Sequence, residues 1–175
     1  MKVFQPLLAR IADGLVRGLL DQRTAAHYLG AHLARRLYCS RVAFWTIADA
    51  PGRAVLTRLG GHDALLDRPL AGAATLRVDA PSAWLGELLA RGSFVSVNAA
   101  ADRRLIAQRE PYLAPQRVGS LLQAVIGDEE HLCGIVSCEQ VGEPRLWTHD
   151  EAALLTRVAD AIARMREQRL ALELA

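Results

Sequence analysis

The segment that decides the fold runs from Val118 to Gln140 and reads VGSLLQAVIGDEEHLCGIVSCEQ. Two apolar runs, residues 119–126 and 132–140, flank a polar turn at residues 127–130. Apolar runs of this length suit buried strands, and a short polar turn between two of them is typical of an antiparallel hairpin. We therefore expect residues 118–140 to fold back on themselves as neighbouring strands of one sheet.

Helices are expected at both ends of the chain. Thr148 and Glu151 have the spacing of a capping box, so a long helix is expected to begin there. The first 38 residues carry an apolar stripe with helical period, interrupted at residues 21–24, where Thr24 is the expected cap of a second helix. These helices have apolar faces that a sheet would cover.

A second hairpin is expected between these helices and the first hairpin. Residues 41–47 (RVAFWTI) are β-branched and aromatic, residues 49–52 (DAPG) have turn chemistry, and residues 54–59 form the return strand. Residues 60–74 show little pattern and are expected to be a loop. The remaining elements are short strands near residues 76–78 and 94–97, with short helices after Pro81 and between Asp102 and Tyr112.

The composition sets limits on function. The chain has 175 residues, of which 51% are hydrophobic, and a formal net charge of +2. This length fits one domain with a full core, and the small charge gives no reason to expect nucleic acid. The sequence shows no membrane span and no signal peptide. Three cysteines without a dense pattern indicate a reducing, cytoplasmic compartment.

Three consecutive segments carry a resemblance to a known family. The segments are VGSLLQAVI (118–126), LCGIVSCE (132–139) and VGEPRLWT (141–148), and Tyr112 to Pro115 adds a weaker match. Together they resemble the GAF domain of bacterial signalling proteins, a small-molecule sensor module found in histidine kinases and diguanylate cyclases. The resemblance covers residues 23–165, which leaves residues 1–22 as an N-terminal helical arm and residues 166–175 as the end of the last helix.

The resemblance implies an α+β, profilin-like fold. We expect a central antiparallel sheet of about five to six strands, with the N- and C-terminal helices on one face. Short helices and loops would form a ligand pocket on the other face. The sequence departs from the subgroup at Asn98, where an aspartate is usual, and at Gln140, where a histidine is common. The ligand is therefore left open.

The pocket is expected to combine an apolar wall with a few polar groups. Strict alternation along residues 131–139 would place Cys133, Ile135, Ser137 and Glu139 on one face. A polar side chain on a strand between helical layers suits a pocket better than a core. The candidate pocket residues are Phe44, Trp84, Phe94, Ser96, Asn98, Asp102, Tyr112, Gln123, Cys133, Ser137 and Glu139.

Other chemistries find little support in the sequence. The five histidines are scattered, and no metal site is expected. A covalent bilin is not expected, because Cys39 is followed by Ser40 where bilin-binding relatives have a Cys-His pair. The cofactor is otherwise unknown. Some GAF proteins resemble free-methionine-sulfoxide reductases, so a redox enzyme stays open as an alternative.

The terminal helices predict a second role. Their apolar residues exceed what one sheet face needs, and such faces usually meet a partner. We expect a homodimer through a helical bundle, with the candidate interface Leu8, Ile11, Leu15, Val158, Ile162 and Met165. If the chain is an excised fragment, a kinase or diguanylate cyclase output domain would follow it.

The sequence thus predicts a non-catalytic sensing and dimerisation module of bacterial signal transduction. Its ligand is an unidentified small molecule, and neither nucleic acid nor a membrane is an expected partner. Besides the reductase, one further alternative stays open. In it the domain is a structural dimerisation module, and its vestigial pocket is filled by side chains.

Overall fold

The computed structural model describes residues 4–50, 53–70, 72, 74–79, 82–127 and 132–173. The strands are β1 (Arg41–Ala50), β2 (Arg53–Asp63), β3 (Arg68–Pro69), β4 (Thr75–Asp79), β5 (Ser93–Ser96), β6 (Val118–Ile126) and β7 (Gly134–Val141). The helices are α1 (Phe4–Val16), α2 (Gln22–Leu37), α3 (Ala83–Arg91), α4 (Ile106–Gln108) and α5 (His149–Glu173). A 3₁₀ turn, η1 (Arg103–Leu105), and a π-helical turn, η2 (Arg109–Leu113), flank α4.

The strands form one antiparallel sheet with the order β3-β2-β1-β7-β6-β5, and β4 pairs with β2. Both predicted hairpins are confirmed, and they meet at the centre where β1 pairs with β7. The sheet has seven strands rather than the expected five to six. The additional strand is β3, which has only two residues and therefore leaves no periodic signal in the sequence.

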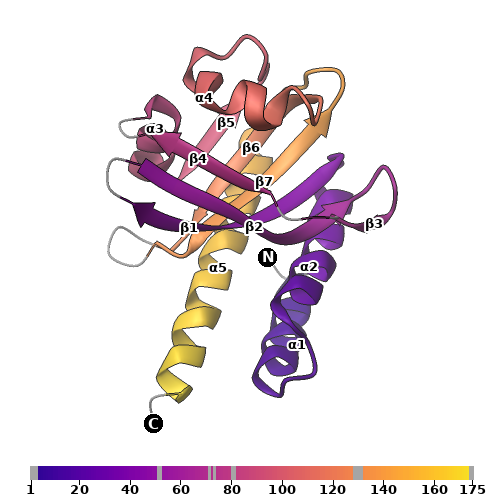
Figure 1. Cartoon of the computed structure of the whole chain (residues 1–175). Coiled ribbons are helices and arrows are strands. Elements are labelled where there is room, and N and C mark those ends of the chain that lie inside the picture. The colour runs from indigo at the N-terminus through magenta and orange to yellow at the C-terminus, as the bar shows by residue number, and fades with distance from the viewer. Residues whose placement is uncertain are drawn as a thin grey trace.

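The terminal helices α1, α2 and α5 cover one face of the sheet, as expected, whereas α3 and α4 lie on the opposite side (Figure 1). The helix-side core joins Leu33 of α2 and Leu155 of α5 to Val42, Leu122 and Val136 of the sheet. All five side chains are fully buried. We call this face of the sheet the helix side and the other face the pocket side.

The helix starts confirm one predicted cap and correct another. Thr148 and Glu151 form the capping box: the Thr148 amide donates to Glu151 Oε2 at 2.7 Å, and the Glu151 amide donates to Thr148 Oγ1 at 3.2 Å. At α2, however, Asp21 is the cap rather than Thr24, whose amide donates to Asp21 Oδ1 at 2.7 Å. Both side chains have capping chemistry, so the sequence alone did not separate them.

The expected loop at residues 60–74 is partly wrong. β2 continues through Asp63, and Gly61 pairs with Ala43 of β1. A Cβ atom at Gly61 would lie 2.0 Å from the Val42 carbonyl oxygen, so only glycine allows this close approach. A pair of glycines weakens the sequence pattern of a strand. Here Gly60 and Gly61 lie inside β2, at an irregularity in its pairing with β1, and do not end the strand.

The candidate dimer residues lie mostly inside the chain. Leu8 and Ile11 of α1 and Val158 of α5 are buried in the helix-side core. Leu15, Ile162 and Met165 are partly buried and pack against the same core. The apolar stripes of the terminal helices therefore cover the sheet and each other. Among the described residues, no helix is both long enough and apolar enough to cross a membrane.

Candidate functional site

The candidate site is a nearly filled cavity on the pocket side of the sheet. It lies between strands β1, β2, β4, β6 and β7, helix α3, and the segment that contains α4 and η2. Its free volume is about 10 Å³, which is about enough for one water molecule. The lining residues are Trp45, Leu56, Leu76, Trp84, Gln108, Tyr112, Leu113, Leu121, Gln123, Ser137 and Glu139.

Two hydrogen-bonded groups fill this space. In the first, Trp84 Nε1 donates to Gln123 Oε1 at 2.7 Å, and Gln123 Nε2 donates to Ser137 Oγ at 3.2 Å. In the second, the Tyr112 hydroxyl donates to Glu139 Oε1 at 2.8 Å. The Tyr112 ring also packs edge-on against Trp45, with ring centroids 5.2 Å apart. The pocket walls are thus held by their own side chains.

Glu139 is the unusual member of this set. Its side chain is only 1% exposed, and its Oε2 atom has no hydrogen-bond partner among the described residues. Burial raises the pKa of Glu139, although Tyr112 and the nearby Arg41 and Arg58 oppose that shift. A buried carboxylate oxygen without a donor costs free energy, about 1–3 kcal/mol for a typical polar group. A core built only for stability would avoid it.

Arg41 lies beside two carboxylates, Glu139 and Asp63. Arg41 Nη1 lies 4.0 Å from Glu139 Oε2, and Arg41 Nε lies 3.4 Å from Asp63 Oδ2. Arg41 Nη1 also donates to Gln116 Oε1 at 3.1 Å. Glu139 therefore has a cation near it without a direct hydrogen bond from that cation. Burial and the adjacent carboxylate both raise the pKa of Tyr112, which keeps its hydroxyl a donor.

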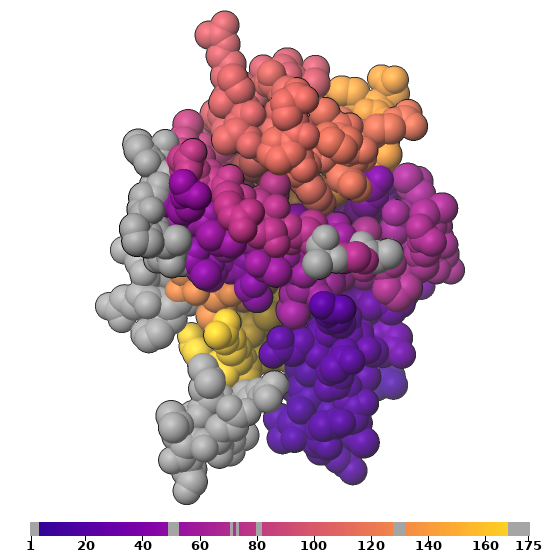
Figure 2. Space-filling model, viewed as in Figure 1, coloured from indigo at the N-terminus to yellow at the C-terminus, as the bar shows by residue number. Residues whose placement is uncertain are grey.

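Residues 102–117 form what we call the lid, because they carry Gln108, Tyr112 and Leu113 over the cavity. The lid begins at Asp102, whose Oδ1 accepts the Arg104 amide at 3.0 Å. It contains a π-helical turn, a rare conformation that is frequent at functional sites. In Figure 2 the salmon segment, which includes the lid, covers the top of the molecule without an opening in that view.

Arg104 fastens the lid to the neighbouring elements. Its guanidinium donates to both oxygens of Glu87 in α3 and to the Val95 carbonyl of β5. It also donates to both oxygens of Asp102 and lies over the Phe94 ring, 4.4 Å from the centroid. The hydrogen bonds from Arg104 lower the pKa of Asp102. One side chain therefore ties the start of the lid to α3 and β5.

The structure brings together part of the predicted pocket set. Trp84, Tyr112, Gln123, Ser137 and Glu139 line the cavity. The strand phase of β7 is as expected for the last two, because Val136 and Cys138 point to the helix side. The polar residues of β6 and β7 were therefore the ones that correctly indicated which face of the sheet carries the pocket.

Two predicted residues lie on the wrong face. Phe44 belongs to the helix-side core, and its neighbour Trp45 lines the cavity instead. Successive strand residues alternate faces, so a one-residue error in phase exchanged them. Cys133 also packs against the helix-side core, because it precedes the start of β7 at Gly134 and the strand alternation does not extend to it.

The remaining predicted residues support the site without lining it. Phe94 is buried beneath Arg104, and Ser96 is buried beside Asp102. Asn98 is exposed, and its Oδ1 accepts the Ala101 amide at 3.2 Å in the turn before the lid. Sequence reasoning missed Trp45, Leu56, Leu76, Gln108, Leu113 and Leu121. Strand alternation could have found Trp45 and Leu76, whereas Gln108 carries no signal of its own.

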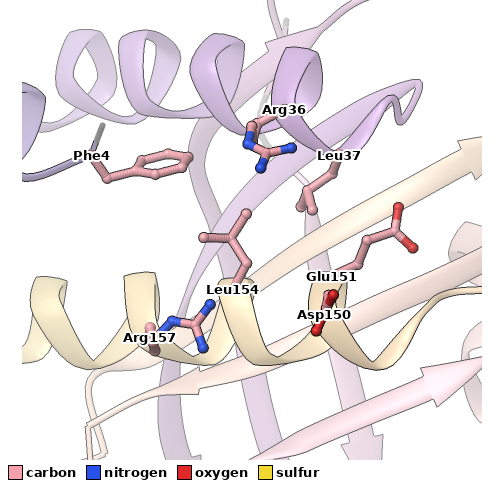
Figure 3. A pocket seen from close by; sticks show the side chains of 7 residues that line it. All are labelled: Phe4, Arg36, Leu37, Asp150, Glu151, Leu154 and Arg157. Atoms are coloured by element: carbon pink, nitrogen blue, oxygen red, sulfur yellow. The ribbon is translucent and has the colours of Figure 1, made fainter. Parts of the chain in front are cut away.

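A second hollow, of about 380 Å³, lies on the helix side between α2 and α5 (Figure 3). Arg36 and Arg157 reach toward it from opposite walls in Figure 3, and Phe4, Leu37 and Leu154 form its buried floor. Asp150 and Glu151 complete the lining. Its walls thus carry both signs of charge.

Arg145 joins the two helices at the end of this hollow. Its Nη1 donates to the carbonyl oxygens of Leu37 at 2.9 Å and Tyr38 at 3.1 Å, at the C-terminal end of α2. Its Nη2 donates to Glu151 in the first turn of α5. The guanidinium also lies over the Trp147 ring, 4.2 Å from the centroid.

Metal chemistry has no visible basis in the described part of the chain, which holds no cluster of three or more His, Cys, Asp or Glu suited to an ion. All three cysteines are free, and Cys39, Cys133 and Cys138 all pack on the helix side. The pocket therefore contains no thiol.

The comparisons with known proteins agree with this fold. The family model for the GAF domain matches residues 21–165. The chain belongs to the GAF domain family, whose members are mostly sensory and regulatory modules of signalling proteins. No curated protein sequence matches this chain.

Solved structures of several functions share the fold. A red/green cyanobacteriochrome in its red-light-absorbing state has a TM-score of 0.66 and 18% identity, over 83% of this chain and 93% of that one. A GAF domain from a phosphoenolpyruvate-protein phosphotransferase of Coxiella burnetii has a TM-score of 0.63 and 17% identity, over 97% and 96%. A free methionine-R-sulfoxide reductase of Neisseria meningitidis, solved with its substrate, has a TM-score of 0.61 and 14% identity, over 97% and 91%.

Proposed function

We propose that this GAF domain is a non-catalytic, ligand-gated regulatory module. In the described state its pocket is closed by its own side chains, and a small molecule would enter by displacing the lid. The observation that carries this proposal is the unpaired Oε2 atom of the buried Glu139 beside a cavity of about 10 Å³. A vestigial, purely structural pocket would have no use for an unsatisfied buried carboxylate.

The strands offer a route from the pocket to α5. On β6, Gln123 lines the cavity, whereas Leu122 and Ala124 on either side of it pack in the helix-side core with Leu155 of α5. If β6 shifts to accommodate a ligand, its packing against α5 must therefore change as well. The size of such coupling is limited by the difference in ligand affinity between the two packings.

Two alternatives receive less support. Covalent bilin attachment and thiol-based reduction of a sulfoxide both need a cysteine at the pocket, and all three cysteines lie on the helix side. A structural module with a filled pocket accounts for the small cavity but not for Glu139.

A thermal-shift screen of small molecules tests the proposal. A ligand present at 100 times its Kd would stabilise the fold by about 2.7 kcal/mol. The test variant is Ser137→Val, which fills the cavity and removes a hydroxyl. The control is Thr57→Val, which also replaces a hydroxyl with a methyl group, at an exposed strand position.

We expect compounds that stabilise the wild type and Thr57→Val but lose most of their effect on Ser137→Val. If no compound stabilises the protein, or if the shifts are equal in all three proteins, a ligand-gated pocket is excluded and the structural module is favoured.

A further inference from the structure

The pocket carries information about the chemistry of its ligand. The unpaired atom is a carboxylate oxygen, which accepts hydrogen bonds and cannot donate them while ionised. Burial favours the protonated form, and the Tyr112 hydroxyl bond to the other oxygen and Arg41 at 4.0 Å both oppose that effect. A ligand that donates an N–H bond to Glu139 Oε2 would satisfy the one orphaned acceptor at this cavity.

The charged side chains around Glu139 indicate which ligand charge the pocket would favour. Glu139 and Asp63 are offset by Arg41, and Arg58 also acts on Glu139. A cation placed at Glu139 Oε2 would lie close to the Arg41 guanidinium and would be repelled by it. An anion would meet the carboxylate itself. A neutral donor avoids both costs.

The side chains that line the cavity indicate the shape of the ligand. Trp45, Trp84 and Tyr112 are aromatic, and Leu56, Leu76 and Leu121 are aliphatic. Aromatic rings pack well against other planar groups, and their hydrogen-bonding ends are already used: Trp84 Nε1 by Gln123 and the Tyr112 hydroxyl by Glu139. A flat molecule would therefore pack against Trp45 and Trp84 once the lid carries Tyr112 away.

Building on the proposed function, we propose that the pocket takes a neutral, planar molecule that donates an N–H hydrogen bond to Glu139, such as an aromatic amide or lactam. The Tyr112 hydroxyl holds one Glu139 oxygen in the closed state, and the ligand takes the free one. Specificity for N–H donors resides in Glu139, and specificity for flat molecules resides in the two tryptophans.

Three probes that share one ring test this directly. Benzamide is a neutral N–H donor, benzoate is an anion without a donor, and benzamidine is a cation with N–H donors. Binding of each is measured by ligand-observed NMR with the full chain at neutral pH. The test variant is Glu139→Gln, and the matched control is Glu143→Gln, the same change at an exposed position outside the cavity.

We expect benzamide to bind more tightly than benzamidine, and benzoate not to bind. Glu139→Gln should weaken benzamide about tenfold, because a hydrogen bond to a charged acceptor is stronger than one to a neutral amide. Glu143→Gln should leave binding unchanged. If benzoate or benzamidine binds best, or if Glu139→Gln has no effect while Ser137→Val abolishes binding, the ligand class is wrong although the gated pocket stands. If none of the three probes binds the wild type, the ligand class is overturned. The thermal-shift screen then decides separately whether the gated pocket stands.

Discussion

At the scale of single residues, Glu139 makes a pH-dependent prediction. Burial raises its pKa above the ordinary value of 4.5. The folded state therefore holds the proton more tightly than the unfolded state does, and the group disfavours folding once it ionises. Its unfavourable contribution is absent below pH 4.5, grows as the pH rises from 4.5 to the raised pKa, and is constant above that pKa.

The variant Glu139→Gln removes this contribution while keeping an acceptor for Tyr112. We expect it to stabilise the fold by about 1 kcal/mol at pH 7.5, a gain typical of removing a functional group that is poorly satisfied. The gain should vanish near pH 4.5. Urea unfolding of both proteins across this range measures it, and a gain that is equal at both pH values would contradict the assigned titration.

Strand phase decided how well single residues could be predicted. Ser137 and Glu139 were placed correctly because β7 has an unambiguous apolar alternation around them. Phe44 was misplaced because β1 offers aromatic residues on both faces, Phe44 and Trp45, and the sequence does not say which face is which. The partner of Glu139, Tyr112, comes from a π-helical turn that no local pattern announces.

At the scale of elements, Arg104 is expected to control the lid. It ties Asp102 to Glu87 of α3 and to the Val95 carbonyl, and it is partly exposed, which reduces the strength of each contact. A lysine would keep the charge but lose the planar fork that reaches all of these acceptors. We expect Arg104→Lys to cost about 1–2 kcal/mol and to speed amide hydrogen exchange in residues 103–113.

The exchange experiment has an internal control in the opposite layer. Amides in α2 lie on the helix side and should exchange as in the wild type. Arg104 also lowers the pKa of Asp102, so that pair stabilises the fold above pH 3.8 and the stabilisation is lost as the pH falls through the lowered value. The difference between the two proteins should therefore shrink in acid. Equal exchange of the lid in both proteins would show that Arg104 does not fasten it.

A second element-scale prediction concerns Arg145. It hydrogen-bonds the end of α2 and the start of α5 at once, beside the hollow between these two helices. Arg145→Lys should cost about 2 kcal/mol. Because the bridge joins α2 to α5, exchange should rise in the first turns of α5 and leave the lid unchanged. An equal rise in both places would mean general destabilisation.

The elements themselves followed from the sequence to a large extent. The two hairpins and the capping box of α5 were predictable, because strand alternation, turn residues and cap spacing agree at those places. The extension of β2 past Gly60 was not, since its glycines serve a close approach to β1 that only the assembled sheet reveals. The same is true of Asp21, whose capping role depends on where α2 begins.

At the scale of the whole molecule, the sheet separates two layers that meet on the same strands. Gln123 faces the pocket between Leu122 and Ala124, which face the terminal helices. The resemblance to GAF domains predicted this layered arrangement. It did not predict that the pocket is closed, because the closed state depends on how side chains from distant segments pack together.

The last prediction concerns self-association, which stays a prediction for this chain. Val158 is fully buried in the helix-side core, so Val158→Glu would place a charge in the interior. We expect this variant to lose about 3–5 kcal/mol and to unfold rather than merely to dissociate. On α1 and the turn that follows it, the exposed aliphatic side chains include Val16 and Leu19, with 58% and 69% exposure.

If the chain forms a homodimer through its terminal helices, Val16 and Leu19 are therefore the positions to change. The double variant Val16→Glu/Leu19→Glu should shift sedimentation from dimer to monomer, with a change in stability of no more than about 0.5 kcal/mol per site. The matched pair Leu65→Glu/Leu66→Glu alters two equally exposed leucines in the turn before β3, at 61% and 58%, and should leave association unchanged. A wild type that sediments as a monomer at micromolar concentration would exclude the dimer, and the gated pocket would then act within a single chain.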